Sequence, residues 1–103
     1  MKVDYDSEAR SLLFEFGAFG NDDHAEEMAT GECFVWVLDG HPASIQLLDA
    51  DKSIEPLDEV AERFELDKLE LRAAAQAALA APDREITIEV GAQRLLGAGA
   101  KAA

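Results

Sequence analysis

The chain has 103 residues, which fits one domain with a small core, and its 49% hydrophobic content excludes wholesale disorder. The formal net charge is −13, and such a surface repels phosphate backbones, so direct nucleic-acid binding is disfavoured. The charge is uneven: residues 1–55 carry −10 and residues 56–103 carry −3. This acidity favours a basic protein partner, although acidity alone also keeps a small protein soluble.

The first half of the chain is predicted to be an antiparallel meander of about four strands. Residues 2–5 are expected to form an edge strand, followed by a polar turn. Ser11–Phe16 alternates between apolar and polar positions, which predicts a half-buried strand with Leu12, Phe14 and Phe16 on one face.

Residues 17–31 are rich in glycine and acids and predict a long loop, with one helical turn at Ala25–Met28. Cys33–Leu38 is a continuous apolar run, typical of a buried central strand. Asp39 and Gly40 follow it directly, and this pair is a strong hairpin signal. The next strand begins at Pro42, and its inward positions are Ala43, Ile45 and Leu47.

Two helices are predicted in the second half. Pro56 suits a first helical turn, and one apolar stripe follows it, formed by Leu57, Val60, Ala61 and Phe64. Residues 68–81 are rich in Ala and Leu and predict a second helix, with Asp67 as its cap and Pro82 after its end.

A last strand is indicated by the alternation of Ile86, Ile88 and Val90 with polar residues. The predicted class is therefore α+β, with both helices on one face of the sheet. Residues 1–95 are expected to form a single domain and residues 96–103 a flexible tail rich in Gly and Ala.

Two blocks of the first half carry a resemblance to a known family. The matching positions in the first are Lys2, Tyr5, Asp6, Glu8, Ala9 and Leu12, and those in the second are Gly40, Ile45, Leu48, Asp49 and Ala50. Over residues 1–52 the chain resembles a family of small bacterial β-rich proteins classed as a domain of unknown function. The resemblance implies a compact β-domain and an antitoxin-like partnership, and it assigns no functional residue.

The strongest polar cluster is acidic and is the first candidate for partner binding: Asp22, Asp23, Glu26, Glu27 and Glu32. His24, with Asp22 and Asp23, is a weak candidate for a metal site. The segment lacks the ligand spacing of a calcium loop, so a solvated loop is the competing interpretation. His41 follows the hairpin turn and is interpreted as an exposed turn residue.

Phe34 and Trp36 share one face of the predicted central strand. Either they lie beneath the helices, or they form an exposed apolar patch that marks a partner surface. Leu13, Phe19 and Leu38 are candidates to extend such a patch.

The remaining signals argue against catalysis. Cys33 lies in an apolar run with neither histidine near it in sequence, so we expect a buried, reduced thiol. Residues 60–76 faintly resemble a helix-turn-helix, but they offer too few bases for DNA recognition. No cofactor is predicted.

No apolar run reaches the roughly 18 residues of a membrane span, and Met1–Asp4 lacks the apolar core of a signal peptide, so we expect a cytoplasmic protein. The sequence favours a non-enzymatic, antitoxin- or immunity-like neutraliser of a basic protein. The alternatives are a self-associating structural protein, such as a homodimer, and a small domain that binds a ligand or metal.

Overall fold

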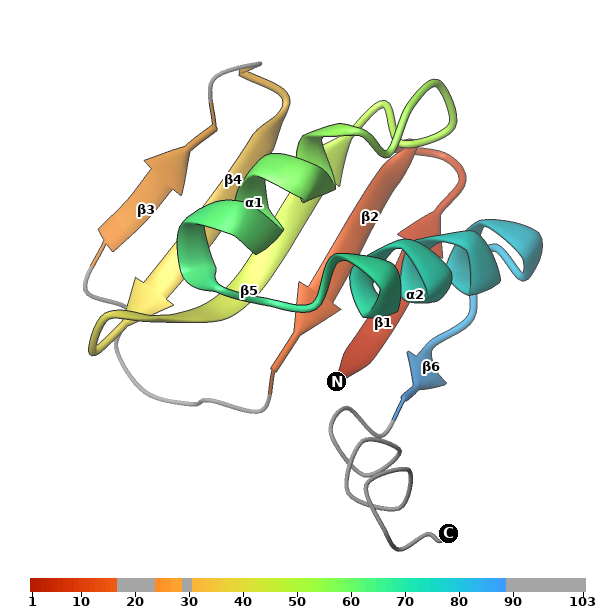
Figure 1. Ribbon diagram of the computed structural model, residues 1–103. Helices are drawn as coiled ribbons and strands as arrows, with labels where there is room; N and C mark the ends of the chain where they lie inside the picture. The colour runs from red at the N-terminus through yellow and green to blue at the C-terminus, as the bar shows by residue number, and fades with distance from the viewer. Residues whose placement is uncertain (17–23, 29–30, 89–103) are drawn as a thin grey trace, which may run out of the picture.

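Two helices cover one face of a six-stranded antiparallel sheet in the computed structural model, which describes residues 1–16, 24–28 and 31–88 (Figure 1). The strands are β1 (Lys2–Asp6), β2 (Ser11–Glu15), β3 (His24–Glu27), β4 (Cys33–Leu38), β5 (His41–Leu48) and β6 (Ile86–Thr87). The helices are α1 (Pro56–Phe64) and α2 (Lys68–Ala80). The predicted α+β class, with both helices on one face, is confirmed. Residues 96–103, the predicted tail, lie outside the described residues.

The strand order is β3-β4-β5-β2-β1-β6, so the predicted simple meander is wrong in its connections. β1 pairs with β2, and β3, β4 and β5 pair in sequence, but β2 pairs with β5 rather than with β3. The chain therefore crosses to the far edge of the sheet after β2 and returns through two hairpins to the middle. In the observed pairing, the buried apolar residues of β2 lie directly opposite those of β5, Leu12 opposite Leu47 and Phe14 opposite Ile45. In a meander β2 and β5 would not be neighbours, and these contacts would be lost.

Residues 25–28 do not form the predicted helical turn; His24–Glu27 is the edge strand β3. Glu and Ala have weak strand propensity, so the local sequence gave no signal. Two tertiary contacts favour a strand over a helical turn for these residues. β4 offers an unpaired edge, and Met28, which follows β3, is buried and donates its backbone N–H to the Cys33 carbonyl at 2.8 Å.

β1 is not the predicted edge strand, because β6 pairs with its other side. The Ile88 backbone N–H donates to the Met1 carbonyl at 2.7 Å, and the Met1 amino group donates to the Ile88 carbonyl at 2.9 Å. β4 is internal, as its apolar run predicts, but the middle strands are β5 and β2. The predicted last strand is confirmed at Ile86–Thr87, and Val90 lies outside the described residues.

Alternate side chains of the sheet point into the layer beneath the helices and form the core. The sheet contributes Val3, Tyr5, Leu12, Phe14, Cys33, Val35, Val37, Ala43, Ile45 and Leu47, all buried. The helices contribute Leu57, Val60, Ala61, Leu71, Ala74, Ala75 and Ala78. The inward positions predicted for β2 and β5 are thus confirmed, with Phe16 partly buried against the same core. This burial is the main source of stability, because each large apolar side chain removed from water contributes roughly 1.5–3 kcal/mol.

The two helices follow their sequence signals closely. α1 begins at Pro56, and its apolar stripe faces the sheet as predicted. Asp67 caps α2, since its side chain accepts the Glu70 backbone N–H at 3.1 Å. Asp58 of α1 accepts from Arg72 of α2 in a two-pronged ion pair, with Nε to Oδ1 at 2.9 Å, which holds the helices together.

Candidate functional site on the open sheet face

Among the described residues, the sheet face opposite the helices has no helix over it, and we call it the open face. Phe34 and Trp36 of β4 lie on this face and not beneath the helices, because they alternate with the buried Cys33, Val35 and Val37. Their ring centroids are 6.4 Å apart and the ring planes are tilted by 48°. Both side chains are half-buried, so they present apolar surface to solvent.

Strand register places the open-face side chains in two rows that cross the sheet. One row runs from β3 to β1 through Glu27, Phe34, Gln46, Leu13 and Asp4. The next row contains Ala25, Trp36, Ser44, Glu15 and Lys2. Directly opposite residues on one face are close enough for their side chains to interact. The first row therefore has Phe34 and Leu13 in its interior and a carboxylate at each end. The second row has Trp36 in its interior, and its carboxylate, Glu15, lies directly opposite Lys2.

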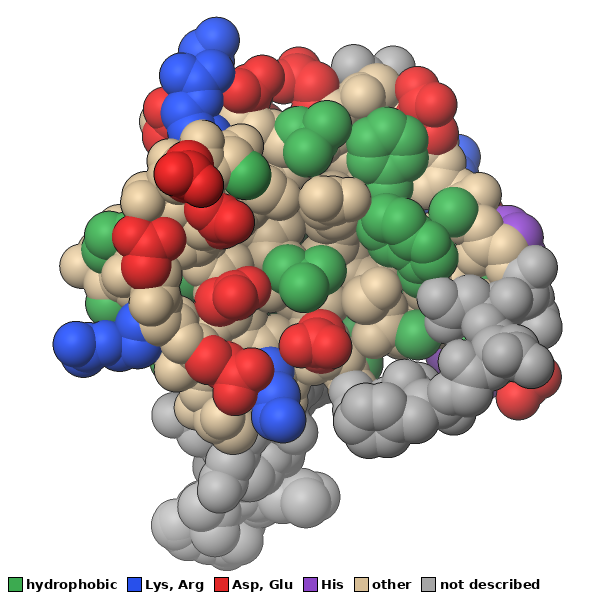
Figure 2. Space-filling model, turned by 180° about the vertical axis from the view of Figure 1, so that it is seen from behind, with side chains coloured by type: hydrophobic (Ala, Val, Ile, Leu, Met, Phe, Trp, Pro, Cys, Tyr) green, Lys and Arg blue, Asp and Glu red, His purple; other side chains and the backbone are tan. Residues whose placement is uncertain are grey.

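Large apolar side chains lie on the open face, on β2, on β4 and at the end of β5. We define the open-face patch as Leu13, Phe34, Trp36, Leu38 and Leu48. Leu13 is 36% exposed, and the other four are half-buried. Figure 2 shows this face, with apolar side chains gathered over the middle of the sheet and acidic ones along its side. Phe19, a predicted extension of the patch, lies outside the described residues.

Carboxylates border the open-face patch on both sides. We define the border acids as Asp4, Asp6 and Glu15 on β1 and β2, and Glu27 on β3. The pKa of Asp4 is raised, first by partial burial and then by repulsion from Glu85 and Asp6. Negative charge is thus crowded on the β1 side, and a cation placed there would relieve the repulsion.

The acids predicted to act together are divided between surfaces. Glu27 lies on the open face opposite Phe34, whereas Glu26 lies on the helix side, where it contacts Arg63 of α1 at 3.1 Å. Glu32 is exposed just before β4, and its carbonyl accepts the Leu48 backbone N–H at 2.8 Å. Asp22 and Asp23 lie outside the described residues.

The candidate metal ligand His24 is engaged by a protein side chain. Its Nε2 lies 2.8 Å from Glu26 Oε2. Within residues 1–16, 24–28 and 31–88, no three His, Cys, Asp or Glu side chains are grouped so that they could hold a metal ion. His41 is exposed at the start of β5, as predicted for a turn residue.

Cys33 is buried in the core as predicted. Burial is the main reason that the pKa of its thiol rises to about 12, with a smaller contribution from Glu59. A thiol with that pKa stays protonated at neutral pH and is a poor nucleophile, so the geometry supports no cysteine chemistry.

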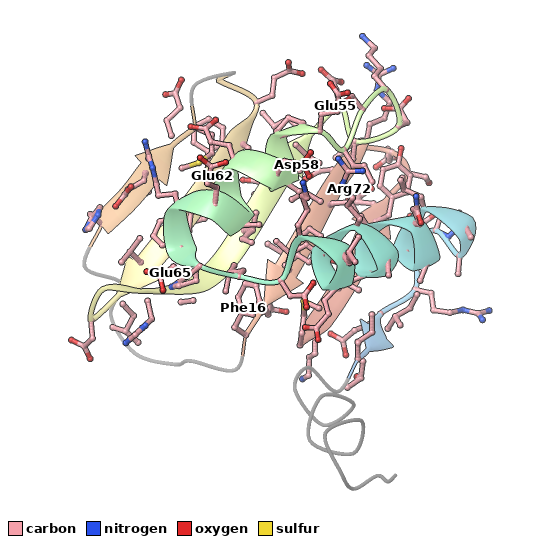
Figure 3. All side chains as sticks on the ribbon, in the orientation of Figure 1. Phe16, Glu55, Asp58, Glu62, Glu65 and Arg72 are labelled. Carbon is pink, nitrogen blue, oxygen red and sulfur yellow. The ribbon has the colours of Figure 1, made fainter. Side chains whose placement is uncertain are left out.

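Hollows on the helix side are small or shallow. A cavity of about 80 Å³ lies beside Phe16 and Glu65, with Met1, Leu66 and Leu71 also lining it (Figure 3). Ligand pockets for small molecules usually measure about 300–1,000 Å³. A second hollow of about 640 Å³ follows α1 and is lined by acids, including Glu55, Asp58 and Glu62 (Figure 3). It is wide open to solvent, and Asp58 is already paired with Arg72. The helix side therefore supports a small-ligand site less well than the open face supports a docking surface.

Several residues of the open face were not predicted from the sequence to be part of a binding site: Asp4, Asp6, Glu15 and Leu48. The alternation of Lys2, Asp4 and Asp6 with apolar residues indicates that they share one face. The pairing of β1 with β2 across the predicted polar turn brings Asp4 beside Leu13. The approach of these strands to Phe34 depends on the pairing of β2 with β5, which has no local sequence signal.

Comparisons of the chain with protein families, with curated proteins and with solved structures find no match. Neither α1 nor α2 has the length and apolar character that a membrane-crossing helix needs.

Proposed function

We propose that this chain is a non-enzymatic interaction domain that binds a basic protein partner on its open face. The observation that carries the proposal is the open-face patch, which has no helix over it among the described residues (Figure 1) and is bordered by Asp4, Asp6 and Glu15 on β1 and β2 and by Glu27 on β3. An apolar centre with a polar rim is the usual anatomy of a protein–protein interface.

The two parts of this surface have different physical roles. Phe34 and Trp36 supply aromatic area, and such residues commonly anchor interfaces when a partner removes them from water. The border acids and the net charge of −13 attract a basic partner over a distance and set its orientation. Contact area therefore holds the complex together, while charge selects the partner and speeds its arrival.

An antitoxin- or immunity-like neutraliser of a basic protein agrees with the size and charge of the chain. On this proposal the domain acts by covering its partner and needs no cofactor or catalytic group.

Self-association is the second candidate, and one observation favours it. β3 is an edge strand that pairs only with β4 among the described residues, and an exposed strand edge is a template for pairing with another chain. However, two copies that met at this edge would bring Glu26 and Glu27 close to the same acids of the other copy. Like charges at short range oppose that contact, so this candidate ranks below a basic partner.

The test compares Glu27, which lies on the open face, with Glu62, an exposed acid of α1 on the helix side. Proteins captured from a lysate of the source organism at low salt would be identified and purified. Their affinity for wild type, Glu27→Gln and Glu62→Gln would then be measured by titration calorimetry. We expect Glu27→Gln to weaken binding and to reduce its salt dependence, while Glu62→Gln retains the affinity.

A second pair of variants tests the apolar contact. Trp36→Ser should weaken capture strongly, whereas Leu69→Ser, which alters a 73% exposed leucine on the helix side, should not. If Trp36→Ser and Glu27→Gln bind the purified partner as tightly as wild type does, the open face is not the binding surface.

A further inference from the structure

The spacing of the open face restricts what kind of partner element fits it. Glu27 and Asp4 end the same row on β3 and β1, four strand intervals apart. Neighbouring strands are about 4.8 Å apart, so these two acids stand roughly 19 Å from each other across the patch. An α-helix with its side chains is about 10–12 Å wide, which leaves about 4 Å on each side. Lysine and arginine side chains are long, so bases on the two flanks of such a helix extend toward these acids.

The patch also has the length of a short helical contact. Phe34, Trp36 and Leu38 follow one another at every second position of β4, over about 13 Å. That length is about two and a half helical turns, since each turn rises 5.4 Å. One apolar stripe with anchors at i, i+3 or i+4, and i+7 would cover it.

We infer that the open face receives a cationic amphipathic α-helix of the partner, laid along the strands with its apolar stripe on the open-face patch and its bases on the border acids. The inference rests on the proposed function and specifies its partner element. The crowding of charge around Asp4 supports it, because bases placed there relieve the repulsion from Asp6 and Glu85.

Two other occupants fit the face less well. A second copy would place an acid-bordered face on another one, and Lys2 is the only base in the two rows. A second sheet would need apolar side chains across its whole width. The rows instead contain Ser44 and Gln46 on β5 between the apolar strands.

Trp36 makes the inference measurable, because it is the only tryptophan of the chain and lies inside the patch. The probes are synthetic peptides of about four helical turns that contain no tryptophan. The first carries Leu and Lys at helical spacing, the second has the same composition in strict alternation, and the third replaces Lys by Glu at helical spacing. We expect the first to shift Trp36 emission to shorter wavelength, saturably, with an affinity at least tenfold above the other two.

Matched charge variants show where the peptide sits. Asp4→Asn combined with Glu27→Gln should weaken the first peptide at least tenfold. Glu55→Gln combined with Glu62→Gln removes the same charge from the helix side and should leave its affinity unchanged. Equal weakening by both pairs would mean unspecific attraction and would overturn the inference.

The remaining outcomes separate this inference from the proposed function. Tighter binding of the alternating Leu/Lys peptide would overturn the helix inference in favour of a basic partner that binds as an extended strand, and it would leave the proposed function standing. If the Leu/Glu peptide bound as tightly as the Leu/Lys peptide at helical spacing, the open face would not select a basic partner, and both the inference and the proposed function would fail. A Trp36 shift that grows with protein concentration alone would make a second copy the occupant. If no peptide shifts the Trp36 emission, the helix inference fails, and the calorimetry of Glu27→Gln against Glu62→Gln still decides the proposed function.

Discussion

Glu26 of β3 and Arg63 of α1 join the edge strand of the sheet to the helix above it, through Oε1 and Nη1 at 3.1 Å. The other Glu26 oxygen lies 2.8 Å from His24 Nε2 on the same strand. β3 has only four residues and is paired by hydrogen bonds to β4 alone in the described part of the chain. These side-chain contacts add to the pairing with β4 and to the burial of Met28, and they are the contacts that join the strand to α1.

We expect Glu26→Gln to loosen β3 without unfolding the sheet. The pKa of Glu26 is lowered, first by the hydrogen bond with His24 and then by the charges of His24 and Arg63, against an opposing effect of desolvation. A lowered folded-state pKa means that the stabilisation is present above the unfolded-state pKa and is lost as pH falls through the folded-state value.

The loosening of β3 can be measured by amide hydrogen exchange. Amides of β3 should exchange faster in Glu26→Gln, and in wild type as acid is added, after correction for the intrinsic pH dependence of exchange. The amides of β2 and β5 should keep their protection. Glu62→Gln, which alters an exposed acid of α1, is the control, and equal loosening of β3 in that variant would contradict the prediction.

Leu12 and Leu13 offer a test of the two faces at adjacent positions. Leu12 is 0% exposed beneath the helices, and Leu13 is 36% exposed on the open face. Leu12→Ala should cost about 2–5 kcal/mol of unfolding free energy, because it leaves a cavity in the core. Leu13→Ala should cost less than about 1 kcal/mol, and urea denaturation of both variants measures the difference. Equal costs would mean that the open face is covered in the folded protein.

The difference between these two leucines was predictable, and much of the open face was not. Alternation along a strand shows which side chains share a face, so Leu12 and Leu13 separate from sequence alone. The apolar stripe of α1 and the Asp67 cap of α2 are also local patterns, and both predictions are confirmed. The predicted pairing of the first two strands places Asp4 beside Leu13, and Glu27 lies beside Phe34 because β3 is a strand and not the predicted helical turn. The two halves of the open face meet only through the long-range pairing of β2 with β5, which was not predicted. β3 itself has no strand-forming sequence and exists because β4 offers an edge.

Asp4→Asn is expected to stabilise the fold at neutral pH. The pKa of Asp4 is raised, first by partial burial and then by the charges of Glu85 and Asp6, so its ionised form costs stability in the folded state. That cost is present above the folded-state pKa and disappears as pH falls below the unfolded-state value. The asparagine variant should therefore unfold at higher temperature than wild type at pH 7, with the gap closing in acid. Glu85→Gln should give a smaller gain, and a destabilised Asp4→Asn variant would refute this account.

Gly40, in the turn between β4 and β5, has a left-handed backbone conformation that residues with a side chain rarely adopt. Asp39 and Gly40 have φ angles of 52° and 78°, the left-handed pair of a two-residue hairpin turn. A Cβ at Gly40 would meet no atom within 4 Å, so Gly40→Ala tests backbone strain without a clash. We expect a loss of about 1–2 kcal/mol in unfolding free energy. Asp39→Asn should change stability less, because asparagine tolerates the left-handed region.

The Cys33 thiol should report on opening of the core. It is buried, and its pKa of about 12 leaves very little thiolate at neutral pH. A thiol reagent such as Ellman's reagent should therefore react slowly with the native protein and at the rate of a free thiol in denaturant. Because Cys33 lies opposite Leu47 of β5, reaction requires separation of β4 from the helix layer or from its neighbour. The native rate should then rise in parallel with the unfolded fraction across a urea titration, and Leu12→Ala should accelerate it more than Leu13→Ala. Rapid labelling of the folded protein would contradict the prediction, because it would mean that the reagent reaches the Cys33 thiol without unfolding.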